Sequence, residues 1–406
     1  MSSARKTAVF ENPSLEDLRA QIDQVDRELV ALLERRANLV FAVGEIKRQK
    51  NLPIHDPERE AKIKIKVQNL TSPDGPLSAG EMSSVFMTLV ERFRKMEEAH
   101  VQINRGIELF PNCSLDFTKP QRVVIWGFGL LGSSFYLALN EILPHWNFLV
   151  IDPALDQAAF MNWRKERKLA NIALSDEVSV KTAALVVLAA PVDVNDRHLA
   201  SSEFQKGALV IDLGSTKRSI QDQFQKKSGT DFTFIGGHPL AGKEVAGFQN
   251  GDALLFYNKV FCWVAPPTRQ VTPPERATAD ALALCLGSKP FWMSADEHDH
   301  ALAWTSHLPQ LLSTTLANVV MNKKFSHEVD YFPGYITELL RTSGSPLSRW
   351  EPIFKTNAVE VKRTLDELIT GLSSVQQKLD DPSRLAIQYS NSNRFYNRFQ
   401  AAKKKG

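Results

Sequence analysis

The chain has 406 residues, 43% of them apolar, so it is long enough for two or three domains with hydrophobic cores of their own. Its 49 Lys and Arg residues nearly balance its 46 Asp and Glu residues, and a net charge of +3 gives no case for nucleic acid or a membrane surface as a partner. The three cysteines lack metal-ligand spacing, and no apolar run reaches the about 18 residues of a membrane span. Residues 1–13 lack the apolar core of a signal peptide. We therefore expect a cytoplasmic protein without a bound metal.

Residues 14–50 predict one long amphipathic helix. Ser14 can cap its start together with Asp17, and apolar residues then recur at alternating spacings of three and four as far as Ile46. Such a helix is about 54 Å long at 1.5 Å per residue, whereas a module of about 110 residues has a radius of gyration near 13 Å. Its own chain cannot cover that apolar face, so we expect an intertwined homodimer.

Arg36 stands where this spacing calls for an apolar residue. A buried guanidinium without a counter-charge is costly, so we expect Arg36 to meet an anion. Further charged residues near it in the sequence are Arg19, Lys47, Asp56, Arg59 and Glu60, although surface ion pairs would account for these alone. A second helix is predicted from Glu81 to about Val101, and residues 106–121 are typical of a connector.

The pattern Leu18-Arg19-x-x-Ile22-Asp23-x-x-Asp26, followed by Val43-Gly44-Glu45-x-Lys47 and by residues 53–60, resembles the all-helical chorismate mutases. That family rearranges chorismate to prephenate by holding a chair-like conformer and stabilising charge on the ether oxygen. The resemblance implies that Arg36, Arg59 and Arg19 of the partner subunit hold the carboxylates, and that Lys47 donates to the ether oxygen. It also implies that Asp56 and Glu60 bind the hydroxyl side and order the pocket.

Two positions depart from the family pattern. Glu97 stands where many relatives have glutamine, and Phe93 where some have serine. A glutamate donates to the ether oxygen only when protonated, so we expect the mutase rate to fall as the pH rises. If this segment lacked mutase chemistry, it would be a dimerising or regulatory helix module; Arg36 together with Lys47 argues against that alternative.

Residues 122–152 show the order strand, glycine turn, helix, strand and acid. The turn is Gly127-Phe128-Gly129-Leu130-Leu131-Gly132, and the second apolar run ends at Asp152. This G-x-G-x-x-G context predicts a dinucleotide site, in which the positive end of the helix holds the pyrophosphate. Asp152 follows Gly132 by 20 residues, where a carboxylate can bind both ribose hydroxyls, which favours NAD over NADP.

Strands are also predicted at residues 183–190, 208–212 and 233–237, alternating with helices. This alternation indicates a mostly parallel, doubly wound α/β sheet of Rossmann type. Ligands of such sheets bind at the carboxyl ends of the strands. Pro191, Ser215 and His238 each follow a strand in this prediction, so we expect them to line one crevice. Glycine and proline flank His238, a setting that suits a catalytic side chain.

The segment Gly236-Gly237-His238-Pro239-Leu240-Ala241-Gly242 resembles the catalytic-histidine segment of prephenate dehydrogenases. From about residue 14 to 400, the chain resembles the bifunctional chorismate mutase/prephenate dehydrogenase (T-protein) family of tyrosine biosynthesis. The resemblance implies NAD-dependent oxidative decarboxylation of prephenate to 4-hydroxyphenylpyruvate, with His238 as the base and Ser215 as its hydrogen-bond partner. Lys243 replaces a small hydroxyl residue of some relatives, so an arogenate or cyclohexadienyl dehydrogenase is the alternative. A β-hydroxyacid dehydrogenase would instead need a catalytic lysine on the long C-terminal helix.

Residues 273–406 predict a helical half that packs a dimer. By family resemblance, His307 lies near the substrate and Arg341 grips its ring carboxylate with a guanidinium fork. His298 and His300 point away from each other on a helix and make no metal site. The predicted elements here are a helix from 273 to about 286, a strand near 291, a long helix through 323, and amphipathic helices at 357–379 and 382–399. The expected architecture is an all-α mutase domain (1–105), a connector (106–121), an α/β NAD domain (122–272) and an all-α dimerisation domain (273–406).

Overall fold

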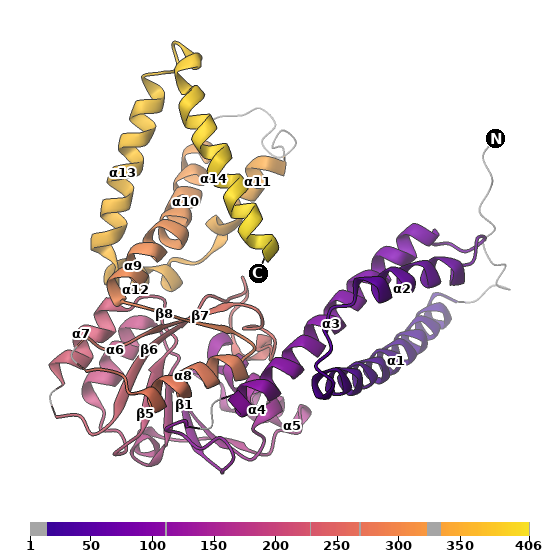
Figure 1. Cartoon of the computed structure of the whole chain (residues 1–406), viewed down its shortest axis with the longest axis horizontal. Coiled ribbons are helices and arrows are strands. Elements are labelled where there is room, and N and C mark those ends of the chain that lie inside the picture. The colour runs from indigo at the N-terminus through magenta and orange to yellow at the C-terminus, as the bar shows by residue number, and fades with distance from the viewer. Residues whose placement is uncertain (1–13, 110–111, 228, 268, 323–333, 406) are drawn as a thin grey trace. The chain divides into compact units, whose positions relative to one another are not determined.

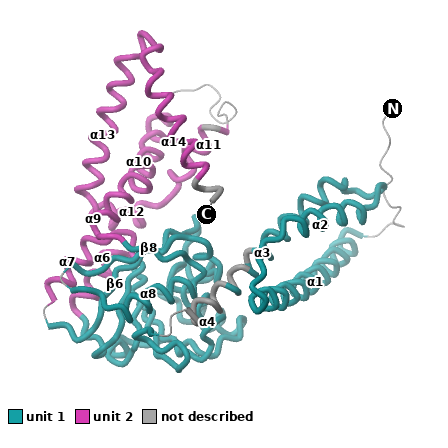
Figure 2. Tube along the Cα trace, viewed as in Figure 1, with its two compact units in different colours: residues 1–190, 202–213, 229–292 teal, residues 191–201, 214–228, 293–406 magenta. Residues whose placement is uncertain are grey.

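The computed structural model describes residues 14–109, 112–227, 229–267, 269–322 and 334–405 (Figure 1). The chain divides into two compact units (Figure 2). Unit 1 comprises residues 1–190, 202–213 and 229–292, and unit 2 comprises residues 191–201, 214–228 and 293–406. The N-terminal helices and the strands therefore belong to unit 1, and the C-terminal helices to unit 2.

Three helices begin the chain: α1 (Leu15–Gln49), α2 (Pro57–Leu70) and α3 (Ala79–Leu109). The predicted cap of α1 is confirmed: the Ser14 hydroxyl accepts from the Asp17 N–H, and the Asp17 carboxylate accepts from the Ser14 N–H, both at 3.1 Å. Helix α3 is longer than predicted and enters the expected connector. Helix α2 was not predicted because lysines interrupt its apolar residues, yet Asp56 caps it and Pro57 suits its first turn.

The sheet of unit 1 has the strand order β3-β2-β1-β4-β5-β6-β7-β8. Strands β1 to β6 pair in parallel, and β7 pairs antiparallel with β6, which confirms the mostly parallel, doubly wound sheet. The strands are β1 (Arg122–Trp126), β2 (Asn147–Ile151), β3 (Ile172–Leu174), β4 (Leu185–Leu188), β5 (Leu209–Asp212), β6 (Thr233–Pro239), β7 (Val260–Val264) and β8 (Lys289–Met293). Along β1, Val123, Val124 and Ile125 are fully buried, because helices cover both faces of a parallel sheet.

One detail of the predicted sheet is wrong. His238 was expected just after its strand, but it lies inside β6, where it pairs with Cys262 of β7. The antiparallel neighbour β7 extends β6 as far as Pro239, and that pairing partner lies too far along the chain for a local sequence pattern to show it.

The remaining helices are divided between the two units. Unit 1 contains α4 (Leu130–Ile142), α5 (Gln157–Glu166) and α8 (Pro273–Cys285). Unit 2 contains α6 (Val192–Ser201), α7 (Arg218–Lys226), α9 (Ala295–Leu302), α10 (Leu308–Met321), α11 (Gly334–Leu340), α12 (Leu347–Thr356), α13 (Ala358–Gln376) and α14 (Ala386–Lys405). A π-helical turn, Ala303–His307, joins α9 to α10, so the predicted long helix is present with one widened turn. Its predicted last residue, Lys323, lies outside the described residues.

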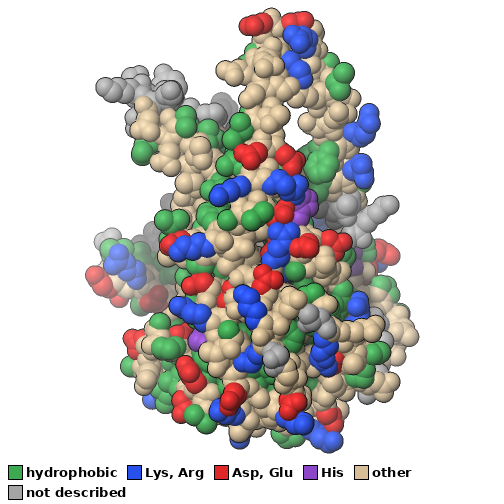
Figure 3. Space-filling model, turned by 90° about the vertical axis from the view of Figure 1, so that its left-hand side faces the viewer, with side chains coloured by type: hydrophobic (Ala, Val, Ile, Leu, Met, Phe, Trp, Pro, Cys, Tyr) green, Lys and Arg blue, Asp and Glu red, His purple; other side chains and the backbone are tan. Residues whose placement is uncertain are grey.

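The described surface carries charges of both signs. On the face drawn in Figure 3, acidic and basic side chains are interspersed, with no broad basic area. No helix within the described ranges is long and apolar enough to cross a bilayer.

Candidate active sites

Six residues predicted for mutase chemistry line one cavity of about 240 Å³ between α1, α2 and α3. They are Arg36, Lys47, Asp56, Arg59, Glu60 and Glu97. Phe93 also lines the cavity, as does Arg94, which the sequence patterns did not single out. Arg19 is not among the lining residues; it lies exposed on the first turns of α1. The fold of a single chain thus brings the predicted charges together, apart from the one assigned to a partner subunit.

Arg36 interrupts the apolar face of α1, and its guanidinium stacks on aromatic rings. Its guanidinium carbon lies 4.4 Å from the centre of the Phe93 ring and 5.8 Å from that of Phe86. One guanidinium nitrogen, Nη1, is buried without a hydrogen-bond partner among the described residues. Burial lowers the pKa of Arg36 below its usual value. An anion in the cavity would satisfy that nitrogen and offset the cost of burying the charge.

Lys47 is held from two sides. Its Nζ lies 2.8 Å from Oε1 of Glu97 and donates to the carbonyl oxygen of Ile54, also at 2.8 Å. Gly44 makes the approach of Glu97 possible, because a Cβ there would lie 2.9 Å from Glu97 Cγ and 3.4 Å from Val101 Cγ2. The close crossing of α1 and α3 at Gly44 therefore sets the position of the Lys47–Glu97 pair.

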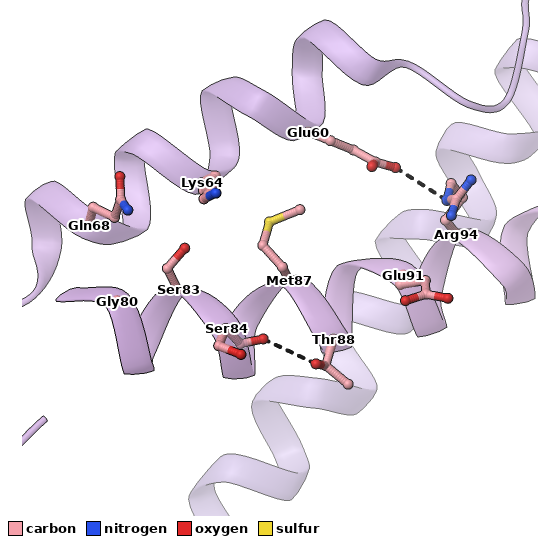
Figure 4. Close-up of a pocket in the computed structure, with 10 residues that line it drawn as sticks. All are labelled: Glu60, Lys64, Gln68, Gly80, Ser83, Ser84, Met87, Thr88, Glu91 and Arg94. Atoms are coloured by element: carbon pink, nitrogen blue, oxygen red, sulfur yellow. Dashed lines mark hydrogen bonds and ion pairs between the residues drawn. The ribbon is translucent and has the colours of Figure 1, made fainter. Parts of the chain in front are cut away.

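Glu60 pairs with Arg94, whose Nε lies 3.3 Å from its carboxylate. The same two residues line a second hollow of about 570 Å³, the groove between α2 and α3 (Figure 4). In that groove, Ser83 is buried and its hydroxyl has no hydrogen-bond partner among the described residues. Lys64 and Gln68 of α2 lie opposite Ser83 (Figure 4). A further polar group in this groove would give the buried Ser83 hydroxyl a hydrogen-bond partner.

The glycine turn has the geometry of a dinucleotide site. Gly127 has φ 96°, a left-handed conformation, and a Cβ on Gly132 would lie 2.2 Å from the Gly127 carbonyl oxygen. Gly129 caps α4, and a Cβ built there would meet no atom within 4 Å. The space beside Gly129 at the helix start is therefore open, and binding of a pyrophosphate there stays a prediction. Asp152 accepts hydrogen bonds from the Phe128 N–H at 2.7 Å and the Ala154 N–H at 3.0 Å, which holds its carboxylate beside the turn.

His238 is half-buried near the end of β6 in unit 1. The neighbouring Gly237 is required by close packing, because a Cβ there would lie 2.5 Å from the Asp212 carbonyl oxygen. The Asp212 carboxylate also accepts the Gly237 N–H at 3.1 Å, which ties the end of β5 to β6. Ser215, in the turn before α7, and Pro191, just before α6, belong to unit 2. Their expected common crevice with His238 stays a prediction.

Two further predicted residues lie in unit 2. His307 belongs to the π-helical turn and is only 1% exposed, and its Nδ1 lies 3.2 Å from Asn357 Nδ2. Burial lowers the pKa of His307 to about 4, so the ring is neutral near pH 7. Arg341 begins a short 3₁₀ turn, Arg341–Gly344, and is exposed. Substrate contact by either residue stays a prediction.

The histidine pair of α9 faces two different environments. His298 is fully buried with its Nδ1 2.8 Å from Asp299, whereas His300 lies 3.0 Å from Glu360. Across the described residues, no group of three or more His, Cys, Asp and Glu side chains is arranged to hold a metal ion.

The helical pocket is rich in arginine and carboxylate side chains, as expected of a module that binds an anionic substrate. The same chain carries an α/β sheet with a glycine turn, as expected of a dinucleotide-dependent dehydrogenase. Together they define the class of the protein as a two-part enzyme. Three family models match in the same order: chorismate mutase type II at residues 18–98, the prephenate dehydrogenase nucleotide-binding domain at 154–283 and the prephenate dehydrogenase dimerization domain at 294–386. The chain belongs to the family of bifunctional chorismate mutase/prephenate dehydrogenases.

Individual relatives agree with this assignment. The chain is 26% identical over 308 residues to the T-protein of Haemophilus influenzae, which covers 75% of this chain and 69% of that protein. It is 25% identical over 275 residues to prephenate dehydrogenase of Lactococcus lactis, which covers 66% of this chain and 74% of the relative. The fold is similar to the crystal structure of prephenate dehydrogenase from A. aeolicus in complex with hydroxyphenyl propionate and NAD⁺. That likeness has a TM-score of 0.61 at 20% identity, and covers 69% of this chain and 98% of the other.

Proposed function

We infer that the chain catalyses two steps of tyrosine biosynthesis: the rearrangement of chorismate to prephenate, and the NAD-dependent oxidative decarboxylation of prephenate to 4-hydroxyphenylpyruvate. One observation carries the first activity: six charged residues predicted from the sequence line a single cavity. The second is supported by the glycine turn, which lies outside the ranges that the family models match and therefore counts as independent support.

In the mutase pocket, we propose that Arg36 and Arg59 bind the two carboxylates of chorismate, together with Arg19 of the partner subunit. Lys47 lines the cavity beside Glu97 and would donate to the ether oxygen, where negative charge grows in the transition state. Asp56 and Glu60 would hold the hydroxyl side. No covalent intermediate is needed, so the rate enhancement comes from orientation and from charge placed in advance.

In the dehydrogenase, the residues of the glycine turn would hold NAD at the start of α4, with Asp152 on the ribose hydroxyls. Leu130 and Leu131 form the first turn of that helix. The bound cofactor supplies the acceptor for a hydride from C4 of the ring. We propose that His238 takes the proton of the ring 4-hydroxyl as carbon dioxide leaves, that Ser215 hydrogen-bonds the hydroxyl, and that Arg341 and His307 contribute to substrate binding.

We further propose a cytoplasmic homodimer with the domain boundaries expected from the sequence. Ile22, Val25, Leu29 and Leu32 of α1 are each at least 50% exposed in one chain, which leaves a continuous apolar face for a second copy. In unit 2, α13 and α14 also expose large apolar residues, among them Leu372 and Phe395, and the matched family model there is a dimerization domain.

A coupled assay tests both activities on one protein. Chorismate should disappear without NAD⁺, and NADH should form from chorismate only when NAD⁺ is added. Arg36→Ala should lower chorismate turnover at least about 100-fold and leave prephenate oxidation unchanged, because it removes the buried partner of the substrate anion. The matched control is Arg35→Ala, which removes the exposed neighbouring arginine. Chorismate turnover at the wild-type rate in Arg36→Ala would contradict the proposed mutase site and would leave dimerisation as the role of the three helices.

The preferred dehydrogenase substrate is tested separately. Prephenate carries a keto-acid side chain and arogenate an amino-acid side chain, so kcat/KM for the two substrates separates a prephenate from an arogenate or cyclohexadienyl dehydrogenase. Lys243 is paired with Asp252 at 2.9 Å, which neutralises its charge within the chain. We propose prephenate as the preferred substrate; a higher kcat/KM for arogenate would contradict this.

A further inference from the structure

The N-terminus of α7 is capped from a distant part of the chain. Its own N-cap residue, Lys217, makes no side-chain capping bond. Instead, Asp299 of α9 accepts the Lys217 N–H at Oδ1 (2.8 Å) and the Arg218 N–H at Oδ2 (2.9 Å). Helix N-termini normally obtain such acceptors from a serine, threonine or aspartate directly before the helix. Here the acceptor lies 82 residues away along the chain from Lys217.

Asp299 also belongs to a larger hydrogen-bonded set, which we call the Asp299 network: Lys217, Arg218, His298, Asp299, His307 and Asn357, all in unit 2. Asp299 is fully buried, and His298 Nδ1 lies 2.8 Å from its Oδ1. Asn357, 2% exposed, donates its Nδ2 to the Asp299 carbonyl oxygen at 2.8 Å and lies 3.2 Å from His307 Nδ1. The network therefore reaches from the start of α7 to the ring of His307.

Ser215 lies two residues before Lys217, in the turn that this carboxylate anchors. A buried carboxylate is costly unless its oxygens are fully hydrogen-bonded, and those of Asp299 are bonded to two backbone N–H groups at the positive end of a helix. These two bonds, to adjacent N–H groups, hold the turn in the orientation that the structure shows. Asn357 meanwhile offers its N–H to His307, whose neutral ring can accept it at Nδ1 when its proton is on Nε2.

We propose that Asp299 is a positioning residue of the dehydrogenase: its carboxylate fixes the turn that carries Ser215, and its backbone carbonyl holds Asn357 beside the ring of His307. The proposal rests on the dehydrogenase role proposed above for Ser215. Asp299 touches neither substrate nor cofactor in it and acts only through the groups that it orients. The competing reading is that Asp299 only stabilises the helices of unit 2.

The first test is Asp299→Asn in the full-length chain. The carboxamide keeps the size but turns an NH₂ group toward one backbone N–H, so the turn must shift. A displacement of this kind costs up to about 100-fold in rate, and we expect kcat for prephenate to fall about 10- to 100-fold with KM for NAD⁺ unchanged. Chorismate turnover by the same protein should be unchanged, which reports an intact chain. Asp296→Asn is the matched control, because Asp296 is on the same helix and, among the described residues, bonds the side chain of Arg218 and no backbone N–H of the turn.

The decisive measurement repeats Asp299→Asn in a Ser215→Ala background. If Asp299 acts through Ser215, the second loss should shrink to less than about threefold, because residues acting as a unit are not additive. Equal losses in the two backgrounds would overturn the proposal. A normal rate in Ser215→Ala alone would instead show that the proposed role of Ser215 fails. If Asp299→Asn does not fold, the smaller Asp299→Ser, whose hydroxyl accepts one N–H, is used in the same cycle.

Discussion

The cavity between α1, α2 and α3 depends on a few side chains whose charges are held before any substrate arrives. Arg36 is stacked on Phe93, and Lys47 is fixed between Glu97 and a backbone carbonyl. The ring of Phe93, which replaces a serine of some relatives, therefore holds the guanidinium for which we propose a role in binding a substrate carboxylate. Preorganised charges of this kind cost no reorganisation at the moment of reaction.

Glu97 gives a prediction at the residue scale. Paired with Lys47 at 2.8 Å, an ionised Glu97 cannot donate to the ether oxygen of chorismate, whereas a glutamine can at any pH. We expect Glu97→Gln to raise chorismate turnover at pH 8 above that of the wild type, because the carboxamide donates to the ether oxygen without needing an added proton. Steady-state chorismate turnover of the two proteins at this pH is the measurement. Equal or lower turnover in Glu97→Gln would remove this role from position 97.

At the scale of elements, two close approaches position the chemistry. Helices α1 and α3 cross at Gly44, the one residue of α1 that is buried within the described range 14–109. The end of β6 is tied to the end of β5 through Gly237, which leaves room for no side chain of its own. In each case a glycine near a proposed catalytic residue lets two elements approach so closely that a methyl group would not fit between them.

Gly44→Ala tests the first of these crossings. Alanine is a better helix former than glycine by about 1 kcal/mol, but its Cβ would press on Glu97 Cγ at 2.9 Å and displace the Lys47–Glu97 pair. We expect chorismate turnover to fall roughly 10-fold, because misplaced catalytic groups lose rate steeply, with prephenate oxidation unchanged. Gly371→Ala is the matched control on α13, where a Cβ meets nothing within 4 Å. It should keep both activities and stabilise its helix by about 0.5–1 kcal/mol; wild-type turnover in Gly44→Ala would show that the crossing tolerates a methyl group.

At the scale of the whole molecule, one chain leaves its mutase site and its surface incomplete. Large apolar residues of α1 are exposed, and Arg19 is absent from the cavity lining. A second copy that packs along α1 and supplies Arg19 would account for both observations. In a two-fold symmetric dimer, each chain would then both give and receive the same residue.

A complementation experiment tests this exchange. Arg19→Ala and Arg36→Ala chains should each be nearly inactive as mutases alone. In a mixed dimer, one site combines the intact Arg36 of the first chain with the intact Arg19 of the second. Random assortment of co-expressed chains should therefore restore about a quarter of wild-type mutase activity. No recovery in mixed dimers, while each variant still oxidises prephenate, would place Arg19 outside the partner's site.

Features whose cause is local could be predicted from the amino-acid sequence alone. The Ser14 cap, the glycine turn with its spaced acid, the alternation of strands and helices, and the odd Arg36 in an apolar seam each depend on residues close together in the chain. Spacing along a helix or strand fixes the direction of each side chain, so these patterns carry directly into structure. Family resemblance then implied roles for the charged residues of the proposed mutase site. All of these residues except Arg19 line one pocket.

Features that join distant residues could not be predicted and came from the folded chain. The fold places Arg94 beside Glu60, extends β6 past His238 through pairing with β7, and widens the helical turn that contains His307. It also showed that Asp299 caps a helix 82 residues away, a partner that no local pattern could name. The physical reason is that burial and hydrogen-bond partners are properties of the packed chain, whereas a sequence motif reports only on neighbours that the backbone already holds together.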